Sequence, residues 1–356
     1  MHAKDGSALV TVLIVVAAIV AVVLLSGVSY EQVQRAQDRQ RFPQIGRSVD
    51  IGGRRLNLYC SGTGQPTVIF ESGGPWPLYA PREMWEHGAP RPGYSWVLVQ
   101  RETAKLTRAC WYDRAGSGWS DLGPYPRSSA AQAADLHALL QAARVPSPYV
   151  LVAEVSAALD ARVFTTLYAS EVTGLVFADG VHPDLLIRAR PGGGRYARVP
   201  KFVGHSQDVT AQLFNQIGLA RLLTTDRLQP TPPQGMTSDE WSLIWRLTEA
   251  PKSRTALLQE VGSWAQSTAE ARAAGNLGER PLVVVSSEST FVPQTVWAEL
   301  QEELSRLSTY GTRIETKVSG GDLIYQAPDA IVAAVRRVLD QVSAKAGHSP
   351  DARPRP

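Results

Sequence analysis

Residues 149–158 read Tyr-Val-Leu-Val-Ala-Glu-Val-Ser-Ala-Ala, an apolar run that leads directly into small and polar residues. The apolar run predicts a buried strand, and the alanines at the end predict the start of a helix. Ala153 and Ala157 lie two residues before and two residues after Val155. Small residues at these two positions permit a sharp strand-to-helix turn whose central residue adopts a strained backbone. We therefore expect such a turn with Val155 at its apex.

Strands and helices alternate along the chain on both sides of this turn. The Gly52-Gly53 pair predicts a tight hairpin between the first two strands. Apolar strands that alternate with helices predict an α/β fold, in which a mostly parallel sheet carries helices on both faces. The predicted strands are 48–51, 55–60, 67–70, 109–112, 149–152, 174–178, 281–285 and 312–318, and the predicted helices are 128–144, 157–169 and 331–342.

One long segment interrupts this alternation. Residues 185–279 are polar and of helical character, with Gly-rich and Pro-rich clusters, which predicts a helical cap inserted between two strands. The core is then formed by residues 46–184 and 280–343. The last residues, 344–356, are rich in proline and charge, and we expect them to be a disordered tail.

The N-terminus carries a strongly apolar segment. Residues 8–25 contain a single polar residue, a threonine, and approach the roughly 20 residues that a helix needs to cross a bilayer. We expect a transmembrane anchor over 8–27 and a polar juxtamembrane stalk over 28–45. A cleaved signal peptide is the alternative, although the run exceeds the usual apolar region of such peptides and no clean Ala-x-Ala site follows. Arginines at 35, 39 and 41 favour a cytoplasmic body by the positive-inside rule.

Composition excludes several other classes of function. The chain has 356 residues and a net charge of +3, and only six of its 36 basic residues are lysines, a bias that favours a GC-rich genome. No basic patch is interleaved with aromatic residues, so we expect no nucleic-acid partner. Neither a metal-ligand spacing nor a glycine-rich phosphate loop after a strand is present, so we expect no metal and no cofactor.

Four motifs, in this order and spacing, are similar to those of bacterial α/β hydrolases. The resemblance covers residues 30–342, with specific matches in the core strands and weak ones in the cap. It implies the α/β-hydrolase fold. The motifs are Gly52-Gly-Arg-Arg-Leu-Asn-Leu-Tyr-Cys-Ser-Gly, Pro66-Thr-Val-Ile-Phe-Glu-Ser-Gly, Tyr112-Asp-Arg-Ala-Gly-Ser-Gly-Trp-Ser-Asp121 and Asp179-Gly-Val-His-Pro-Asp184.

The catalytic positions depart from that family. Members carry Gly-His-Ser-x-Gly-Gly at the nucleophile turn, where this chain has Ala153-Glu-Val-Ser-Ala-Ala158, so the nucleophile position is Val155. Alignment on Pro328-Asp329 places Gly321 at the position of the catalytic histidine. A hydroxyl needs a base to remove its proton, and here both partners are missing. Glu288 or Asp179 could be the remaining acid of the triad.

The neighbouring loop is altered as well. Gly73 and Gly74 stand where the family donates a backbone N–H to the oxyanion, and an insertion of about fifteen residues that includes Trp76 follows them. This insertion could fill the pocket or form a contact surface, or it could be an ordinary surface loop. Ser156 is adjacent to the apex but is expected to start the following helix.

The two cysteines are predicted to pair because of the fold that the resemblance implies. In that fold the second strand is antiparallel to the fourth. Cys60 ends the second and Cys110 begins the fourth, which brings the two side chains within reach of a disulfide. A disulfide implies an oxidising compartment and therefore a body outside the cytoplasm, in conflict with the arginine count. Two buried free thiols are the alternative.

Three functions remain open at this point. The first is a cell-membrane protein, anchored by one helix and catalytically inactive, that serves as a binding or accessory subunit for a membrane-protein partner. The second is an unconventional hydrolase in which Glu288 or Asp179 activates water. The third is a sensor that holds a small apolar ligand in the vestigial pocket, which requires an open apolar cavity beneath the cap.

Overall fold

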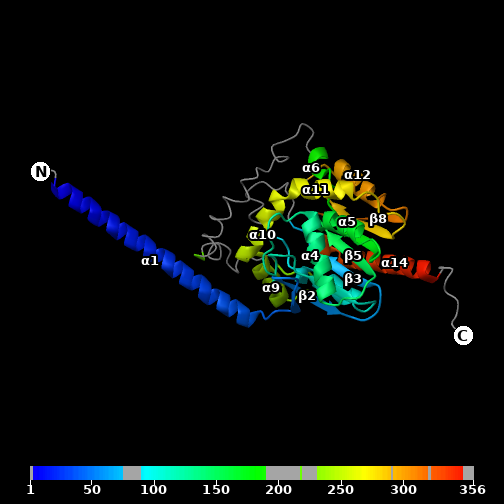
Figure 1. Cartoon of the computed structure of the whole chain (residues 1–356), viewed down its shortest axis with the longest axis horizontal. Coiled ribbons are helices and arrows are strands. Elements are labelled where there is room, and N and C mark those ends of the chain that lie inside the picture. Colours follow the sequence, from blue (N-terminus) through cyan, green and yellow to red (C-terminus); the bar gives the residue numbers. More distant parts are fainter. Residues whose placement is uncertain are drawn as a thin grey trace. The chain divides into compact units, whose positions relative to one another are not determined.

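The computed structural model describes residues 3–74, 90–189, 217–218, 231–289, 292–319 and 322–347. These residues belong to two compact units, one with the N-terminal helix α1 (Ala3–Arg41) and the other with the α/β body (Figure 1). Two predicted site residues, Trp76 and Gly321, lie outside the described residues.

Helix α1 joins the predicted anchor and most of the predicted stalk in one continuous helix. Side chains 10–25 are all exposed within the structure. The segment Val10–Asp38 is long and apolar enough to cross a membrane. Exposed apolar side chains of this number are costly in water, which favours their burial in a bilayer.

The body is built on one sheet of eight strands in the order β1-β2-β4-β3-β5-β6-β7-β8. Strand β2 is antiparallel to both of its neighbours, β1 and β4, and the remaining pairs are parallel, as predicted. The strands are β1 (Arg47–Asp50), β2 (Arg55–Ser61), β3 (Thr67–Glu71), β4 (Ala109–Tyr112), β5 (Tyr149–Glu154), β6 (Val172–Ala178), β7 (Leu282–Glu288) and β8 (Gly311–Ser319).

The β1–β2 hairpin turns at the two predicted glycines. Gly52 and Gly53 have φ values of 97° and 89°, a region that only glycine adopts without strain. The carboxylate of Asp50 accepts hydrogen bonds from both glycine amides, at 2.8 and 3.1 Å.

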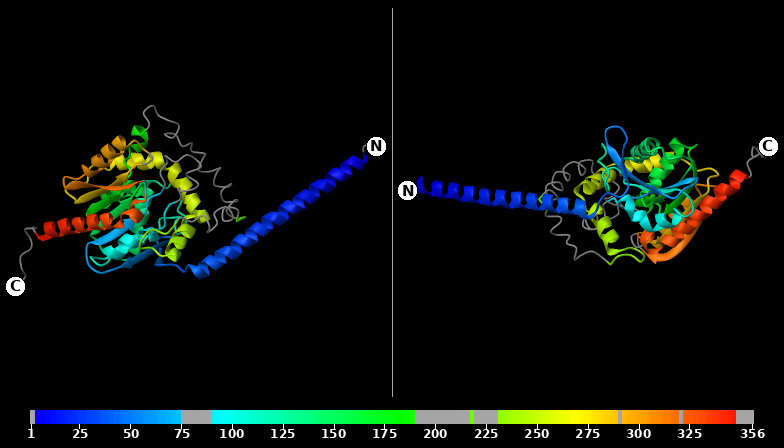
Figure 2. Two further views of the ribbon diagram at one scale, coloured as in Figure 1. Left: turned by 180° about the vertical axis from the view of Figure 1, so that it is seen from behind. Right: turned by 90° about the horizontal axis from the view of Figure 1, so that it is seen from below.

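Helices cover both faces of the sheet (Figure 2). On one face α4, α5 and α12 share a single apolar core with the strands, while α3 and α14 pack together on the other. Strand β6 shows this alternation: Phe177 belongs to the first core, and a Cβ atom on Gly174 would lie 2.4 Å from Val338 of α14. These helices are α3 (Val97–Thr103), α4 (Ser129–Ala142), α5 (Ala157–Leu167), α12 (Gln294–Ser305) and α14 (Pro328–Gly347).

Two boundaries differ from the prediction. Helix α14 begins at Pro328 rather than 331 because proline is well suited to the first turn of a helix, and it continues to Gly347, into the predicted tail. In the views of Figure 2 its C-terminal end projects beyond the sheet. The described part of the predicted cap is helical, with α6 (Leu185–Arg188), α9 (Ser238–Thr248), α10 (Pro251–Gly262) and α11 (Trp264–Ala273).

The predicted disulfide is confirmed. Cys60 of β2 lies directly opposite Cys110 of β4 in the antiparallel register, and the two sulfur atoms are bonded. The bridge closes a loop with a sequence separation of 50 residues. Cross-linking reduces the conformational entropy of the unfolded chain, which stabilises the fold.

Loss of this bridge is expected to lower the free energy of unfolding by about 2–4 kcal/mol. The measurement is denaturant unfolding of the full chain in detergent, followed by tryptophan fluorescence, since all nine tryptophans lie at positions 76–297 and report on the body alone. The Cys60→Ser, Cys110→Ser double variant should match the reduced wild type and be insensitive to reductant. Equal stability of oxidised and reduced wild type would contradict the expectation.

Candidate functional site

Val155 occupies the apex of a sharp turn between β5 and α5. Its φ is 48°, in the left-handed region that β-branched residues strongly disfavour. The turn is held by neighbouring backbone: Val155 N–H donates to the carbonyl of Ala178 at 3.1 Å, and its carbonyl accepts from Val181 N–H at 2.9 Å. The apex thus presents two methyl groups, and Ser156 follows with an ordinary helical φ of −67°.

The loop after β3 lies directly against this turn. A Cβ atom on Gly73 would stand 2.4 Å from the carbonyl oxygen of Glu154 and 2.9 Å from Cβ of Val155. A Cβ atom on Gly74 would stand 2.3 Å from a carboxylate oxygen of Glu260, which comes from helix α10. Glycine is therefore required at Gly73, where the close approach is to backbone, whereas a side chain at Gly74 would have to displace the Glu260 carboxylate.

The side chain of Ser156 is hydrogen-bonded to this loop. Gly74 N–H donates to Ser156 Oγ at 2.8 Å, and the hydroxyl in turn donates to the carbonyl of Gly74 at 3.3 Å. The backbone amide at the oxyanion position is thus already paired within the chain. Ser156 stands at the N-cap position of α5, so it starts this helix as predicted. Its hydroxyl makes no hydrogen bond to the first turn of the helix.

Of the two acids predicted to remain, Asp179 lies beside the turn and Glu288 does not. Asp179 follows β6 with a φ of 49°, and its carboxylate accepts from the N–H and the hydroxyl of Ser287, at 2.7 and 2.8 Å. Burial raises its pKa to about 6, and the two bonds from Ser287 act in the opposite direction. Glu288 is exposed at the end of β7.

A second group of charges surrounds the apex. Glu154, directly before Val155, is buried and forms an ion pair with Arg91 at 3.3 Å. Arg91 also binds Asp322 at 2.7 Å, and its guanidinium carbon lies 5.4 Å from the ring centre of Tyr325. Burial raises the pKa of Glu154 to about 6, while the nearby Arg91 charge lowers it.

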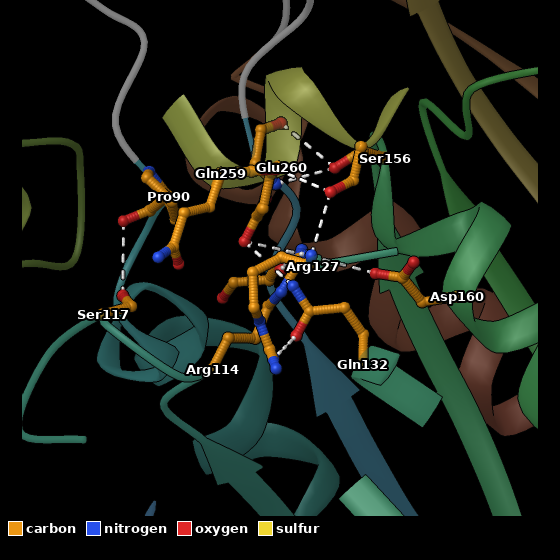
Figure 3. A network of polar contacts seen from close by, with 12 residues as sticks. Pro90, Arg114, Ser117, Arg127, Gln132, Ser156, Asp160, Gln259 and Glu260 are labelled. Carbon is orange, nitrogen blue, oxygen red and sulfur yellow. Dashed lines mark hydrogen bonds and ion pairs between the residues drawn. The ribbon is translucent and has the colours of Figure 1, made fainter. Parts of the chain in front are cut away.

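Behind the turn, a buried network of ion pairs joins the sheet to the cap helix α10. Arg114, which follows β4, lies 3.1 Å from Asp160 of α5 and 3.1 Å from Glu260 of α10 (Figure 3). Gln132 of α4 donates to the same Glu260 oxygen at 3.0 Å. Arg114 also donates to the carbonyl of Ser72 at 2.9 Å, which ties the network to the β3 loop.

This network lines a small cavity of about 20 Å³, with room for about one water molecule. Its walls are mainly polar and charged, with a few apolar groups between them. The lining consists of Arg114, Arg127, Ser129, Ser156, Leu159, Asp160, Glu260, Val261, Trp264 and Ser267. A cavity of this size and polarity is unsuited to an apolar ligand.

Glu71, at the end of β3, has the most strongly shifted pKa of these carboxyl groups. Burial, reinforced by the nearby Asp160, raises its pKa to about 8. Tyr112 donates a hydrogen bond to it at 2.8 Å. Near neutral pH Glu71 is therefore mostly protonated, which reduces the negative charge around Arg114.

Solved structures with a similar fold include hydrolytic enzymes. A haloalkane dehalogenase variant from Bradyrhizobium elkanii superimposes with a TM-score of 0.61 at 17% identity, covering 85% of this chain and 98% of that one. The chain has the α/β-hydrolase fold. A thermophilic esterase from Thermogutta terrifontis shares this fold, with a TM-score of 0.57 at 18% identity and coverage of 84% and 99%. No family model matches the chain.

Relatives by sequence include membrane proteins. A probable transporter, efuK, of Hormonema carpetanum is 24% identical over 322 residues, which are 83% of this chain and 43% of that protein. An uncharacterized vacuolar membrane protein of Saccharomyces cerevisiae is 33% identical over 109 residues, 30% of this chain and 17% of that protein. The chain thus spans less than half the length of these two relatives.

Sequence reasoning located the turn of the α/β-hydrolase fold but missed the charges around it. Gly73, Gly74, Val155, Ser156 and Asp179 meet in one place. Arg91, Glu71 and the Arg114 network were not predicted, since their partners lie far apart in the chain. The one local signal is that both Glu71 and Glu154 directly follow an apolar strand.

Replacement of Glu71 by glutamine is expected to change how stability depends on pH. The folded state holds the Glu71 proton more tightly than the unfolded chain does, since the pKa is about 8 rather than 4.5. The contribution of Glu71 to the free energy of unfolding is therefore constant below pH 4.5, falls as the pH rises toward 8, and is constant above pH 8. Glu71→Gln should gain thermal stability relative to wild type between pH 5 and 8. Parallel melting profiles would contradict this, and Glu279→Gln at an exposed site is the matched control.

Proposed function

We propose that this chain is a membrane-anchored, catalytically inactive protein of the α/β-hydrolase fold that acts as a binding or accessory subunit of a membrane assembly. The observation that carries the proposal is Val155. It stands at the strained apex where this fold places a nucleophile, and it has no hydroxyl, thiol or carboxylate with which to attack a substrate.

The oxyanion position supports the same conclusion. Hydrolysis through a tetrahedral intermediate needs backbone N–H groups that point at the developing negative charge. In this chain Gly74 N–H donates to Ser156 Oγ at 2.8 Å instead. A substrate oxygen would have to displace that hydroxyl.

The membrane part of the proposal rests on α1 and on the relatives. Val10–Asp38 is long and apolar enough to span a bilayer. Two relatives carry the names of a probable transporter and of a vacuolar membrane protein. An inactive body tethered to a membrane by one helix is suited to contact a membrane-protein partner, and we propose such a partner here.

The two other functions have weaker support. A water-activating hydrolase would use Asp179 rather than the exposed Glu288, but both oxygens of Asp179 already accept hydrogen bonds from Ser287. Within the described residues, the cavity beside the turn is small and its lining mainly polar, which does not favour a sensor of small apolar ligands.

The full chain is expected to show no hydrolysis of p-nitrophenyl esters above background. A variant with Val155→Ser, Gly321→His and Ser156→Ala should gain weak but measurable turnover, because it restores nucleophile and base and releases the Gly74 amide. The matched control carries Gly321→His and Ser156→Ala without the new nucleophile, and should remain silent.

Turnover by the wild type at enzyme-like rates would overturn the proposal. Loss of that activity in Asp179→Asn would then identify the water-activating mechanism, whereas its persistence would require a nucleophile elsewhere. A fluorophosphonate probe should label the triple variant and leave the wild type unlabelled.

We further propose that the body lies on the extracytoplasmic side, since the Cys60–Cys110 bridge needs an oxidising compartment to persist. Cells quenched with acid and treated with a maleimide reagent should yield a chain that is modified only after reduction. Modification of both cysteines without prior reduction would place the body in the cytoplasm.

A further inference from the structure

Arg91 lies among side chains from three separate segments of the body, a set of contacts that we call the pocket of Arg91. Its Nη1 lies 3.3 Å from Glu154, at the strand-to-helix turn, and its Nη2 lies 2.7 Å from Asp322, after β8. Tyr325 of α13 (Leu323–Gln326) presents its ring face at 5.4 Å from the guanidinium carbon. A cation is thus held by two carboxylates and one aromatic face.

A third carboxyl group lies near these two ion pairs. Asp179 is close enough that the charges of Arg91 and Asp322 both shift its pKa. Glu154 is 2% exposed, and its Oε1 atom accepts no hydrogen bond from the described residues. A buried carboxylate oxygen without a donor is costly, so an N–H group that reached it would be stabilising.

The aromatic side of the pocket is rigid. Tyr325 is buried, and its ring packs edge-on against Trp241 of α9 with the ring centres 5.2 Å apart. A fixed aromatic face next to carboxylates favours a planar guanidinium or an ammonium group over a neutral ligand.

The pocket also reaches the surface. The side chain of Asp322 is 50% exposed and that of Arg91 is 25% exposed, whereas Glu154 lies beneath them. An incoming cation could therefore reach Asp322 first and exchange with Arg91 without opening the sheet. The exchange replaces one guanidinium–carboxylate pair by another, so the buried charge never becomes unpaired.

We propose that the vestigial active site is a cation-binding site, held in this structure by the chain's own Arg91, and that its ligand is a guanidinium or ammonium group on a basic side chain of the partner protein. This inference rests on the proposed accessory function and names how the partner is recognised. Glu154 and Asp322 bind the cation, Tyr325 covers it, and Arg91 acts as an internal competitor.

The test uses the full chain in detergent micelles with methylguanidinium as the probe. Arg91→Ala empties the pocket and should bind methylguanidinium at least tenfold more tightly than the wild type, because a tethered arginine competes at high effective concentration. Binding is measured by calorimetry and by the rise in melting temperature, against sodium chloride at equal ionic strength. Equal binding by wild type and variant, or none by either, would overturn the proposal.

Three matched variants separate the pocket from general salt effects. Arg91→Ala combined with Glu154→Gln should lose the binding. Arg101→Ala removes another arginine ion pair, with Glu240, and should gain none. If Arg91→Ala does not fold, Arg91→Gln replaces it, because glutamine keeps N–H donors for the carboxylates but no charge; the same tenfold gain is expected.

A second experiment distinguishes an arginine side chain on a peptide from a free guanidinium ion. An arginine-containing tripeptide with blocked ends should bind Arg91→Ala at least as tightly as methylguanidinium does. Binding of methylguanidinium with exclusion of the peptide would overturn the protein partner. Failure of both probes alongside absent esterase activity would reject this site alone and leave the proposed function standing.

Discussion

The backbone reversal at Val155 brings together the loops that follow β3, β5 and β6. A left-handed apex allows the chain to leave a central strand and enter α5 within two residues, and small neighbours at Gly73 and Ala157 leave room for it. Valine is a poor choice for such a conformation on local grounds. Tertiary contacts must therefore hold the turn: Val155 N–H donates to the carbonyl at 178, and the Val155 carbonyl accepts from the N–H at 181.

Charged groups fill the space around this turn. In front of it Arg91 bridges Glu154 and Asp322, and behind it Arg114 bridges Asp160 and Glu260. Buried ion pairs contribute little net stability, but removal of one partner leaves a charge uncompensated and is strongly unfavourable. Such networks therefore bear on which segments pack against each other more than on the net stability of the fold.

The fold could be predicted from the sequence because its signals are local. Apolar runs such as 67–70 and 149–152 marked the strands, the glycines at 52 and 53 marked the hairpin, and Ala153 with Ala157 marked the apex. The charged contacts could not be predicted in this way. Arg91 and Asp322 are separated by 231 positions, and no periodicity links them. The last helix was predicted to begin at 331, where its apolar spacing begins, so the first turn, which opens with proline at 328, was missed.

The disulfide has a topological consequence for the segment it encloses. Residues between Cys60 and Cys110 form a covalent ring that contains β3, the glycines at 73 and 74, and Arg91. A protease that cuts the chain once inside this ring produces no separate fragments, because the two pieces remain joined through sulfur. Where reductants are scarce, a chain nicked once within this ring would keep β2 and β4 covalently joined.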